Sequence, residues 1–200
     1  MTLLEKAPAE SFREGTVPVL ETERLVLRPP RLEDARAIST LINDRRIVEM
    51  TVRVPHPYTF ADAESWLATV NTHKGQASFL VTLADGTLIG VCSTTLRESG
   101  ILELGYWFGV AYWGKGYATE AARAVIDHAF DDLGHELLHA GARISNPASR
   151  RVLEKCGFQW TGVGLYRIRS LASSAPFDRF RLDRGIWASL KSWGASKRVQ

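Results

Sequence analysis

The segment Tyr112-Trp113-Gly114-Lys115-Gly116-Tyr117-Ala118-Thr119-Glu120 is the most informative part of the sequence. Apolar residues then recur at helical spacing, at positions 118, 121, 122, 125, 126, 129 and 130, which predicts an amphipathic helix that opens directly from a glycine pair. Glycine lets the backbone approach a ligand closely, and the first N–H groups of a helix have no acceptor within it. A strand, a glycine-rich loop and a helix N-terminus together form an anion-binding site that suits phosphates.

Strands and helices are expected on both sides of this loop. Before it, strands over 79–83, 88–96 and 101–108 are joined by tight turns, which predicts an antiparallel meander. The other expected elements are a strand over 24–28, a helix over 34–41 with a shorter one up to Met50, a helix from a Thr59 cap to Val70, helices over 118–133, 147–156 and 187–193, and strands over 137–143, 158–168 and 177–182. The sequence therefore predicts a single mixed α/β domain over residues 21–193, between a flexible N-terminal extension (1–20) and a C-terminal tail (194–200).

The composition excludes several classes of protein. Of the 200 residues, 45% are hydrophobic and 24% are charged, as in an ordinary globular domain. No apolar run approaches the roughly 18 residues that a membrane helix needs, and the N-terminus lacks the apolar core of a secretory signal. We therefore expect a cytoplasmic protein with no membrane partner. The net charge of +3 is spread along the chain, so no nucleic-acid partner is expected either.

The cysteine and histidine residues do not indicate a catalytic nucleophile, a disulfide or a metal site. Cys92 and Cys156 lie in apolar segments, and we expect reduced core thiols rather than a disulfide or a nucleophile. His135 and His139 lie in a predicted strand with no third ligand nearby, so no metal site is expected.

Two familiar phosphate-binding loops do not fit the glycine segment. The loop of nucleoside-triphosphatases requires Ser or Thr after the lysine, whereas Lys115 is followed by glycine. The dinucleotide fingerprint requires a third glycine, and Thr119 occupies that position. Both interpretations are therefore rejected.

The segment instead resembles the coenzyme A pyrophosphate loop of the GCN5-related N-acetyltransferase (GNAT) superfamily, whose pattern is Gln/Arg-x-x-Gly-x-Gly/Ala. Gly116 and Ala118 match the small positions, and Trp113 stands where Gln or Arg is usual, a departure common in the RimJ/RimL-like branch of ribosomal-protein N-terminal acetyltransferases. Segments 21–28, 54–59, 103–107 and 146–158 resemble that branch in the same order. The resemblance implies a GNAT fold, with a mostly antiparallel twisted sheet, flanked by helices and splayed between its fourth and fifth strands, 101–108 and 137–143.

The resemblance implies acetyl-CoA as co-substrate and no metal. Backbone groups of Phe108, Gly109 and Val110 would pair with the pantetheine arm, and one N–H, that of Phe108, would polarise the thioester carbonyl. The pyrophosphate is expected against the loop residues Trp113, Gly114, Lys115, Gly116, Tyr117, Ala118 and Thr119. The positive end of the helix dipole and the charge of Lys115 favour this placement, although Lys115 also fits a solvated surface position.

Three further residues are candidates for the chemistry. Asn146 is a good N-cap, and its equivalent in related enzymes contacts the pantetheine arm. Ser149 would lie close to the cofactor sulfur and protonate the leaving thiolate, relay a proton or hydrogen-bond the sulfur. Glu103 is the candidate base that deprotonates the amine, and it also fits a salt-bridged or solvent-facing strand position.

The expected reaction is direct transfer of an acetyl group from acetyl-CoA to a primary amine, without an acetyl-enzyme. The branch favours a protein N-terminal α-amine as acceptor. A small amine (an aminoglycoside, polyamine, amino acid or peptide) and a non-catalytic CoA-binding module remain alternatives. Acceptor specificity is expected in the loops 44–60 and 169–177. Homodimers are frequent in this family, and no residue in the sequence indicates one.

Overall fold

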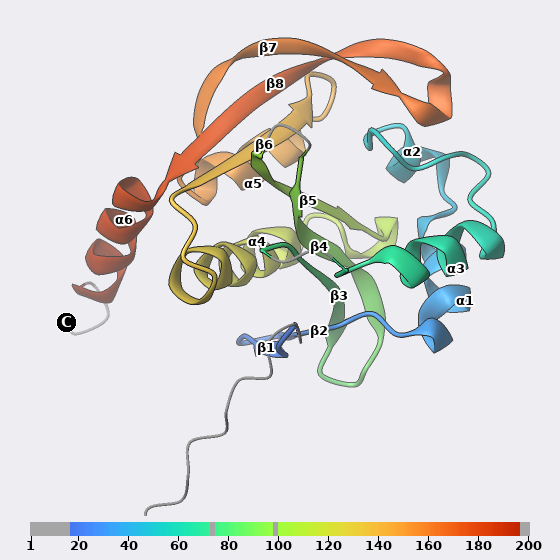
Figure 1. Cartoon of the computed structure of the whole chain (residues 1–200), viewed down its shortest axis with the longest axis horizontal. Helices are drawn as coiled ribbons and strands as arrows, with labels where there is room; N and C mark the ends of the chain where they lie inside the picture. The colour runs from blue at the N-terminus through green and yellow to red at the C-terminus, as the bar shows by residue number, and fades with distance from the viewer. Residues whose placement is uncertain (1–16, 73–74, 98–99, 197–200) are drawn as a thin grey trace, which may run out of the picture.

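The computed structural model describes residues 17–72, 75–97 and 100–196, which form one sheet with helices on both faces (Figure 1). The strands are β1 (Leu20–Glu21), β2 (Leu25–Arg28), β3 (Ala77–Leu83), β4 (Leu88–Leu96), β5 (Leu102–Phe108), β6 (Leu137–Arg143), β7 (Gln159–Ile168) and β8 (Ser173–Asp183). The helices are α1 (Ala35–Ile42), α2 (Arg45–Val48), α3 (Phe60–Thr69), α4 (Tyr117–Asp127), α5 (Pro147–Lys155) and α6 (Arg184–Ser196), with short helical turns at Leu32–Asp34, Val110–Tyr112, His128–Asp132 and Arg169–Leu171.

The strand order in the sheet is β1-β2-β3-β4-β5-β6-β8-β7. Strands β3, β4 and β5 form the predicted antiparallel meander. The pair β5–β6 is parallel, and the other neighbouring strands are antiparallel. The prediction of a mixed α/β fold with a mostly antiparallel sheet is therefore confirmed.

The sheet opens between β5 and β6. Their pairing is limited to Glu103 with His139 and Leu104 with Ala140, although β5 continues to Phe108 and β6 to Arg143. Because the two strands separate after Leu104, the backbone edges of both become available to a ligand. This is the splay that the resemblance implied.

Two apolar clusters, one on each face, hold the sheet and position its strands. On one face, Leu104 and Phe108 of β5 lie in the cluster that contains the apolar side of α4. On the other face, Trp107 packs against the cluster that joins α1, α2 and α3 to the sheet. Since side chains alternate along a strand, Glu103 and Gly105 lie on the same face as Trp107.

Several boundaries differ from the predicted ones. The last strand begins at Ser173, four residues earlier than predicted, because residues 173–176 pair with β7 before the pairing with β6 begins at Phe177. Leu20, within the predicted extension, pairs with Leu27, and α6 continues into the predicted tail as far as Ser196. The rest of the extension and tail, residues 1–16 and 197–200, lies outside the described residues.

Both cysteines are free and buried in the α4-side core. Burial raises the pKa of the Cys92 thiol well above its ordinary value and that of Cys156 to about 11. The thiolate, which is the nucleophilic form, is therefore scarce at both positions near neutral pH. The prediction of reduced core thiols is confirmed. Within the described ranges, no helix is both long enough and apolar enough to cross a membrane.

Candidate active site

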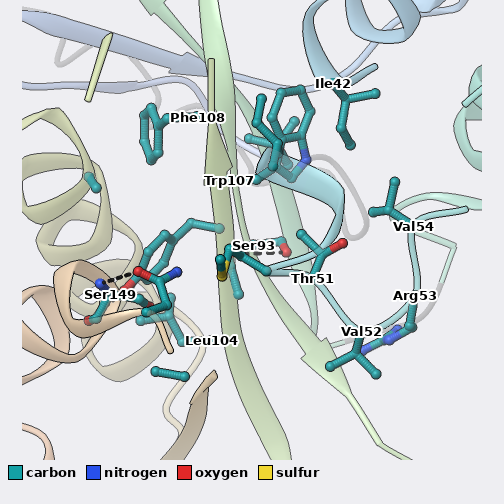
Figure 2. Close-up of a pocket in the computed structure, with 18 of the residues that line it drawn as sticks. Ile42, Thr51, Val52, Arg53, Val54, Ser93, Leu104, Trp107, Phe108 and Ser149 are labelled. Atoms are coloured by element: carbon teal, nitrogen blue, oxygen red, sulfur yellow. Dashed lines mark hydrogen bonds between the residues drawn. The ribbon is translucent and has the colours of Figure 1, made fainter. Parts of the chain in front are cut away.

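A cavity of about 1060 Å³ lies where β5 and β6 separate, and it reaches both faces of the sheet. Figure 2 shows Phe108 and Ser149 on one side of this pocket and the segment Thr51 to Val54 on the other. The cavity is lined by these predicted site residues: Glu103, Phe108, Trp113, Gly114, Gly116, Tyr117, Ala118, Thr119, Asn146 and Ser149. Gly109, Val110 and Lys115 are not part of its lining.

The glycine loop presents backbone donors to the cavity. Gly114 and Gly116 have φ angles of 74° and 84°, a conformation that side chains with a Cβ rarely adopt, and Gly116 is the N-cap of α4. Among the described residues, the N–H groups of Gly114, Lys115 and Gly116 have no hydrogen-bond acceptor, and the first helical N–H groups have none within the helix. Thr119 differs, because its N–H donates to the Gly116 carbonyl oxygen at 3.1 Å. The free donors therefore span residues 114–118.

Arg24 holds this loop in place, a role that the sequence pattern did not reveal. Its guanidinium donates to the Lys115 carbonyl oxygen at 3.0 Å and to the Glu120 carboxylate at 2.7 Å. Thr22 donates to the same carboxylate at 2.7 Å. The start of β2 is thereby tied to the first turn of α4. Arg24 lies 96 residues from Glu120 in the chain, so no local spacing rule connects them.

The Lys115 side chain is not part of the cavity lining. Its ammonium group lies 5.8 Å from the centre of the Tyr112 ring, and the residue is exposed. A role in binding the pyrophosphate stays a prediction for this side chain, whereas its backbone N–H belongs to the row of free donors.

The end of β5 offers one strand edge to the opening. Gly109 donates its N–H to the Ile89 carbonyl oxygen at 2.9 Å, and its own carbonyl accepts from Tyr112. Successive N–H groups of a strand point to opposite edges, so the N–H of Phe108 faces the gap toward β6. The Trp113 indole donates to the Phe108 carbonyl oxygen at 2.7 Å. The backbone of Gly109 is thus engaged, and that of Phe108 keeps its donor.

Gly109 lies against α1. A Cβ at this position would lie 2.5 Å from the end of the Leu41 side chain, which would have to move to accept any other residue.

Ser149 lies in the first turn of α5 and forms a pair with Tyr106 of β5. The two hydroxyl oxygens are 2.9 Å apart, and the Tyr106 hydroxyl also donates to the Ser149 carbonyl oxygen at 3.2 Å. Burial raises the pKa of Tyr106 well above its ordinary value, so the phenol stays protonated. The Asn146 side chain accepts from the Ser149 N–H at 3.1 Å, which confirms its predicted capping role. Nothing in the sequence indicated that Tyr106 contacts Ser149.

Glu103 lies on the opposite wall and is ion-paired with Arg97. Its side chain is 23% exposed and borders the cavity together with Trp107. The alternative expected for this residue, a salt-bridged strand position, is therefore observed, and its role as the base stays a prediction.

The two loops expected to determine acceptor specificity contact each other beside this wall. Arg169 donates its N–H to the Val52 carbonyl oxygen at 2.9 Å, and the Ser170 hydroxyl donates to the Val48 carbonyl oxygen at 3.3 Å. Residues of both loops, including Arg53 and Arg169, line the cavity. No group of three or more metal-ligating side chains occurs in the part of the chain that the structure describes.

Residues 24–159 match a family model described as an acetyltransferase (GNAT) domain. The chain belongs to the GNAT acetyltransferase family. Over 152 residues this GNAT chain is 32% identical to a Bacillus licheniformis protein called uncharacterized N-acetyltransferase p20, covering 72% of this chain and 84% of that one. The protein is accordingly an acyltransferase that depends on acetyl-CoA, as the resemblance implied.

Solved structures share the GNAT fold. Mycobacterium smegmatis RimJ in complex with CoA-disulfide has a TM-score of 0.70 at 21% identity, over 80% of this chain and 82% of that one. Vibrio cholerae spermidine N-acetyltransferase in complex with CoA and spermine has a TM-score of 0.71 at 22% identity, over 84% of this chain and 99% of that one. At such identities the likeness establishes the fold alone.

Proposed function

We propose that this GNAT enzyme transfers an acetyl group directly to a primary amine, and that a protein N-terminal α-amine is the acceptor. The observation that supports direct transfer is the shape of the site. A continuous cavity joins a row of free backbone N–H groups on one face of the sheet to a carboxylate, Glu103, on the other. A ternary complex of enzyme, acetyl-CoA and amine fits such a passage.

The loop side suits acetyl-CoA, which would supply an activated thioester carbonyl when bound. The donors of residues 114–118 would hold its pyrophosphate, helped by the positive end of the α4 dipole. The N–H of Phe108 would pair with the pantetheine arm and donate to the oxyanion. Val110, the second predicted backbone partner, lies outside the cavity lining and already accepts from the Trp113 N–H. Asn146 would contact the arm from the start of α5.

Two groups would move the protons. Glu103 would accept the proton of the ammonium form of the acceptor, directly or through water, and its ion pair with Arg97 fixes the carboxylate at the cavity wall. Ser149 would donate to the leaving thiolate, with the protonated Tyr106 hydroxyl behind it. Since each group lies on its own wall, attack and departure can occur from opposite sides.

The proposed acceptor follows from the family resemblance and not from the shape of the site. The five ordered segments that resemble the RimJ/RimL-like branch favour a protein N-terminus, and a solved RimJ structure shares the fold. The spermidine acetyltransferase with the same fold supports a small amine as the second candidate. N-terminal peptides, polyamines and aminoglycosides should therefore be compared by the release of CoA thiol.

The variant Glu103→Gln tests the proposed base. We expect kcat/KM to fall by about 100-fold or more, while the affinity for acetyl-CoA measured by calorimetry is unchanged. Glu64→Gln is the matched control, because Glu64 is exposed on α3 and outside the cavity lining. Equal activity of the two variants would contradict the role of Glu103. Acetyl-CoA binding without turnover of any amine would indicate a non-catalytic CoA-binding module.

A further inference from the structure

The wall of the cavity that contains Glu103 and the two loops beside it is called the acceptor side here, and it carries more positive than negative charge. Its charged lining consists of three arginines and two carboxylates, which are Arg53, Arg97, Arg169, Asp62 and Glu103. One of these arginines, Arg97, is ion-paired with Glu103. Asp62 is instead hydrogen-bonded to Thr59 at the cap of α3, and no ion pair joins it to an arginine among the described residues. Of the two arginines without an ion pair, one lies in the electrostatic field of the Arg97–Glu103 pair.

That group is Arg53. Its side chain forms no hydrogen bond or ion pair with any residue in the ranges that the structure describes. It is solvent-accessible within the pocket. Partial desolvation by the pocket walls lowers the pKa of Arg53, the neighbouring Arg97 lowers it further, and Glu103 raises it. The guanidinium therefore lies in the field of the proposed base and is not compensated by it.

The backbone around Arg53 is held on both sides. Val52 packs against the cluster of Ile168 and Phe177, and Val54 packs against the cluster of α1 and α3. Figure 2 shows Val52, Arg53 and Val54 in a row along one wall of the pocket. Because the backbone is anchored, a ligand that binds Arg53 has to order only the side chain and not the segment that carries it.

An unpaired guanidinium here is unsuited to an acceptor that carries positive charge alone. An amine arrives as an ammonium ion, and both Arg53 and Arg97 repel it. A carboxylate on the same molecule removes this conflict, because it matches the planar fork of the guanidinium with two parallel hydrogen bonds. A single surplus positive charge suits one carboxylate better than a doubly charged phosphate.

We propose that the acceptor carries a carboxylate close to its primary amine, and that Arg53 binds this carboxylate while the amine faces Glu103. The inference rests on the proposed acetyl transfer and adds the charge of the acceptor to it. Two sources offer the same chemistry: the α-carboxylate of a free amino acid, and the acidic side chain of a residue near a peptide N-terminus. Arg53 would then determine specificity and would contribute to acceptor binding rather than to proton transfer.

Paired acceptors test this directly. One pair is alanine and alaninamide, and the other is a set of peptides that begin Ser-Asp or Ser-Asn. In at least one pair we expect the carboxylate member to have a kcat/KM about 10- to 100-fold higher, as for a charge-assisted hydrogen bond. Whichever pair responds identifies the source of the carboxylate. The N-acetylated product of that pair should also bind more weakly to Arg53→Gln in a calorimetric titration.

Arg53→Gln should abolish the preference mainly through KM, and Arg53→Lys should retain part of it. The two amines in a pair differ in basicity. This difference cancels when the preference of the wild type is divided by the preference of the variant. Arg45→Gln is the matched control, because Arg45 is exposed on α2, pairs with Glu49 and lies outside the cavity lining. This control should keep the full preference.

The outcomes separate the two proposals. CoA release with equal kcat/KM for both members of each pair, or a preference that persists in Arg53→Gln, would overturn the carboxylate inference and leave acetyl transfer intact. Binding of acetyl-CoA without CoA release from any acceptor would overturn the proposed function, and this inference with it.

Discussion

At the scale of single residues, Tyr106 and Ser149 form a unit whose parts come from different elements. Their hydroxyl groups are 2.9 Å apart across 43 residues of sequence. We predict that Tyr106→Phe lowers kcat by about tenfold and leaves the KM for acetyl-CoA nearly unchanged, because the ring stays and the contacts of its hydroxyl group with Ser149 are lost. Tyr106 would act here as a positioning residue. Steady-state kinetics with a peptide acceptor measure the effect.

A double-mutant cycle distinguishes positioning from a merely structural role. If Tyr106 acts through Ser149, adding Tyr106→Phe to Ser149→Ala should change kcat little further. Tyr166→Phe is the control, since the Tyr166 ring packs on Phe177 and lies outside the cavity lining. Fully additive losses in the cycle would contradict the coupling.

The same residues show what a sequence pattern can tell about a site. Strand alternation is enough to put Glu103 on one face and Tyr106 on the other, because side-chain direction is a local property. Their partners, Arg97 and Ser149, are set by the hairpin geometry and by the packing of α5 on β6, which a local pattern does not contain. The residue types of the site were therefore predictable, and its contacts were not.

At the scale of elements, the start of α4 depends on an ion pair with the first strands. Partial burial alone would raise the pKa of Glu120, but hydrogen bonds from Thr22 and Arg24 lower it below its ordinary value. A carboxyl group whose pKa is lower in the folded state adds stability above its unfolded pKa, and this stability is lost as the pH falls. We predict that Glu120→Gln lowers the free energy of unfolding by about 1 kcal/mol at pH 7.

The pH dependence of this stability difference tests whether the charge of Glu120 is responsible. The difference between wild type and Glu120→Gln should be fully present at pH 7 and should shrink as the pH falls below the ordinary pKa of a glutamate, about 4.3. Urea unfolding at pH 7, 5 and 4 measures it. Glu154→Gln, at an exposed pair on α5, should change stability by less than about 0.5 kcal/mol. A difference that stays constant with pH would show that the charge of Glu120 is not what stabilises the helix start.

At the scale of the whole molecule, short sequence features predicted which helices and strands form, but they predicted less well where each one begins and ends. The Thr59 capping box, the Asn146 cap and the glycine turns are short-range features, and the structure contains each of them. The early start of β8 was missed because Ser173 to Pro176 has the composition of a loop, and only pairing with β7 makes it a strand. The opening between β5 and β6 is likewise a property of the assembled sheet. It was expected through the family resemblance and not through periodicity.

Binding of acetyl-CoA to the glycine loop should raise the free energy of unfolding of the whole chain. A ligand at 100 times its Kd adds about 2.7 kcal/mol to the free energy of unfolding. For a chain of this size that corresponds to a rise in Tm of roughly 5–11 °C. Gly116→Asp should abolish most of this rise, because it puts a side chain and a negative charge among the free N–H groups. Thermal unfolding with and without acetyl-CoA measures both effects.

The hairpin turn at Gly86 provides the control for backbone strain. Its φ of 85° nearly equals the 84° of Gly116, and a Cβ there would meet no atom within 4 Å. Gly86→Asp should therefore lower the ligand-free Tm by a similar amount, since both substitutions place a Cβ in the left-handed region. It should nevertheless keep the full rise with acetyl-CoA. A rise lost in both variants would assign the effect to global destabilisation, whereas a rise kept in both would contradict the loop as the pyrophosphate site.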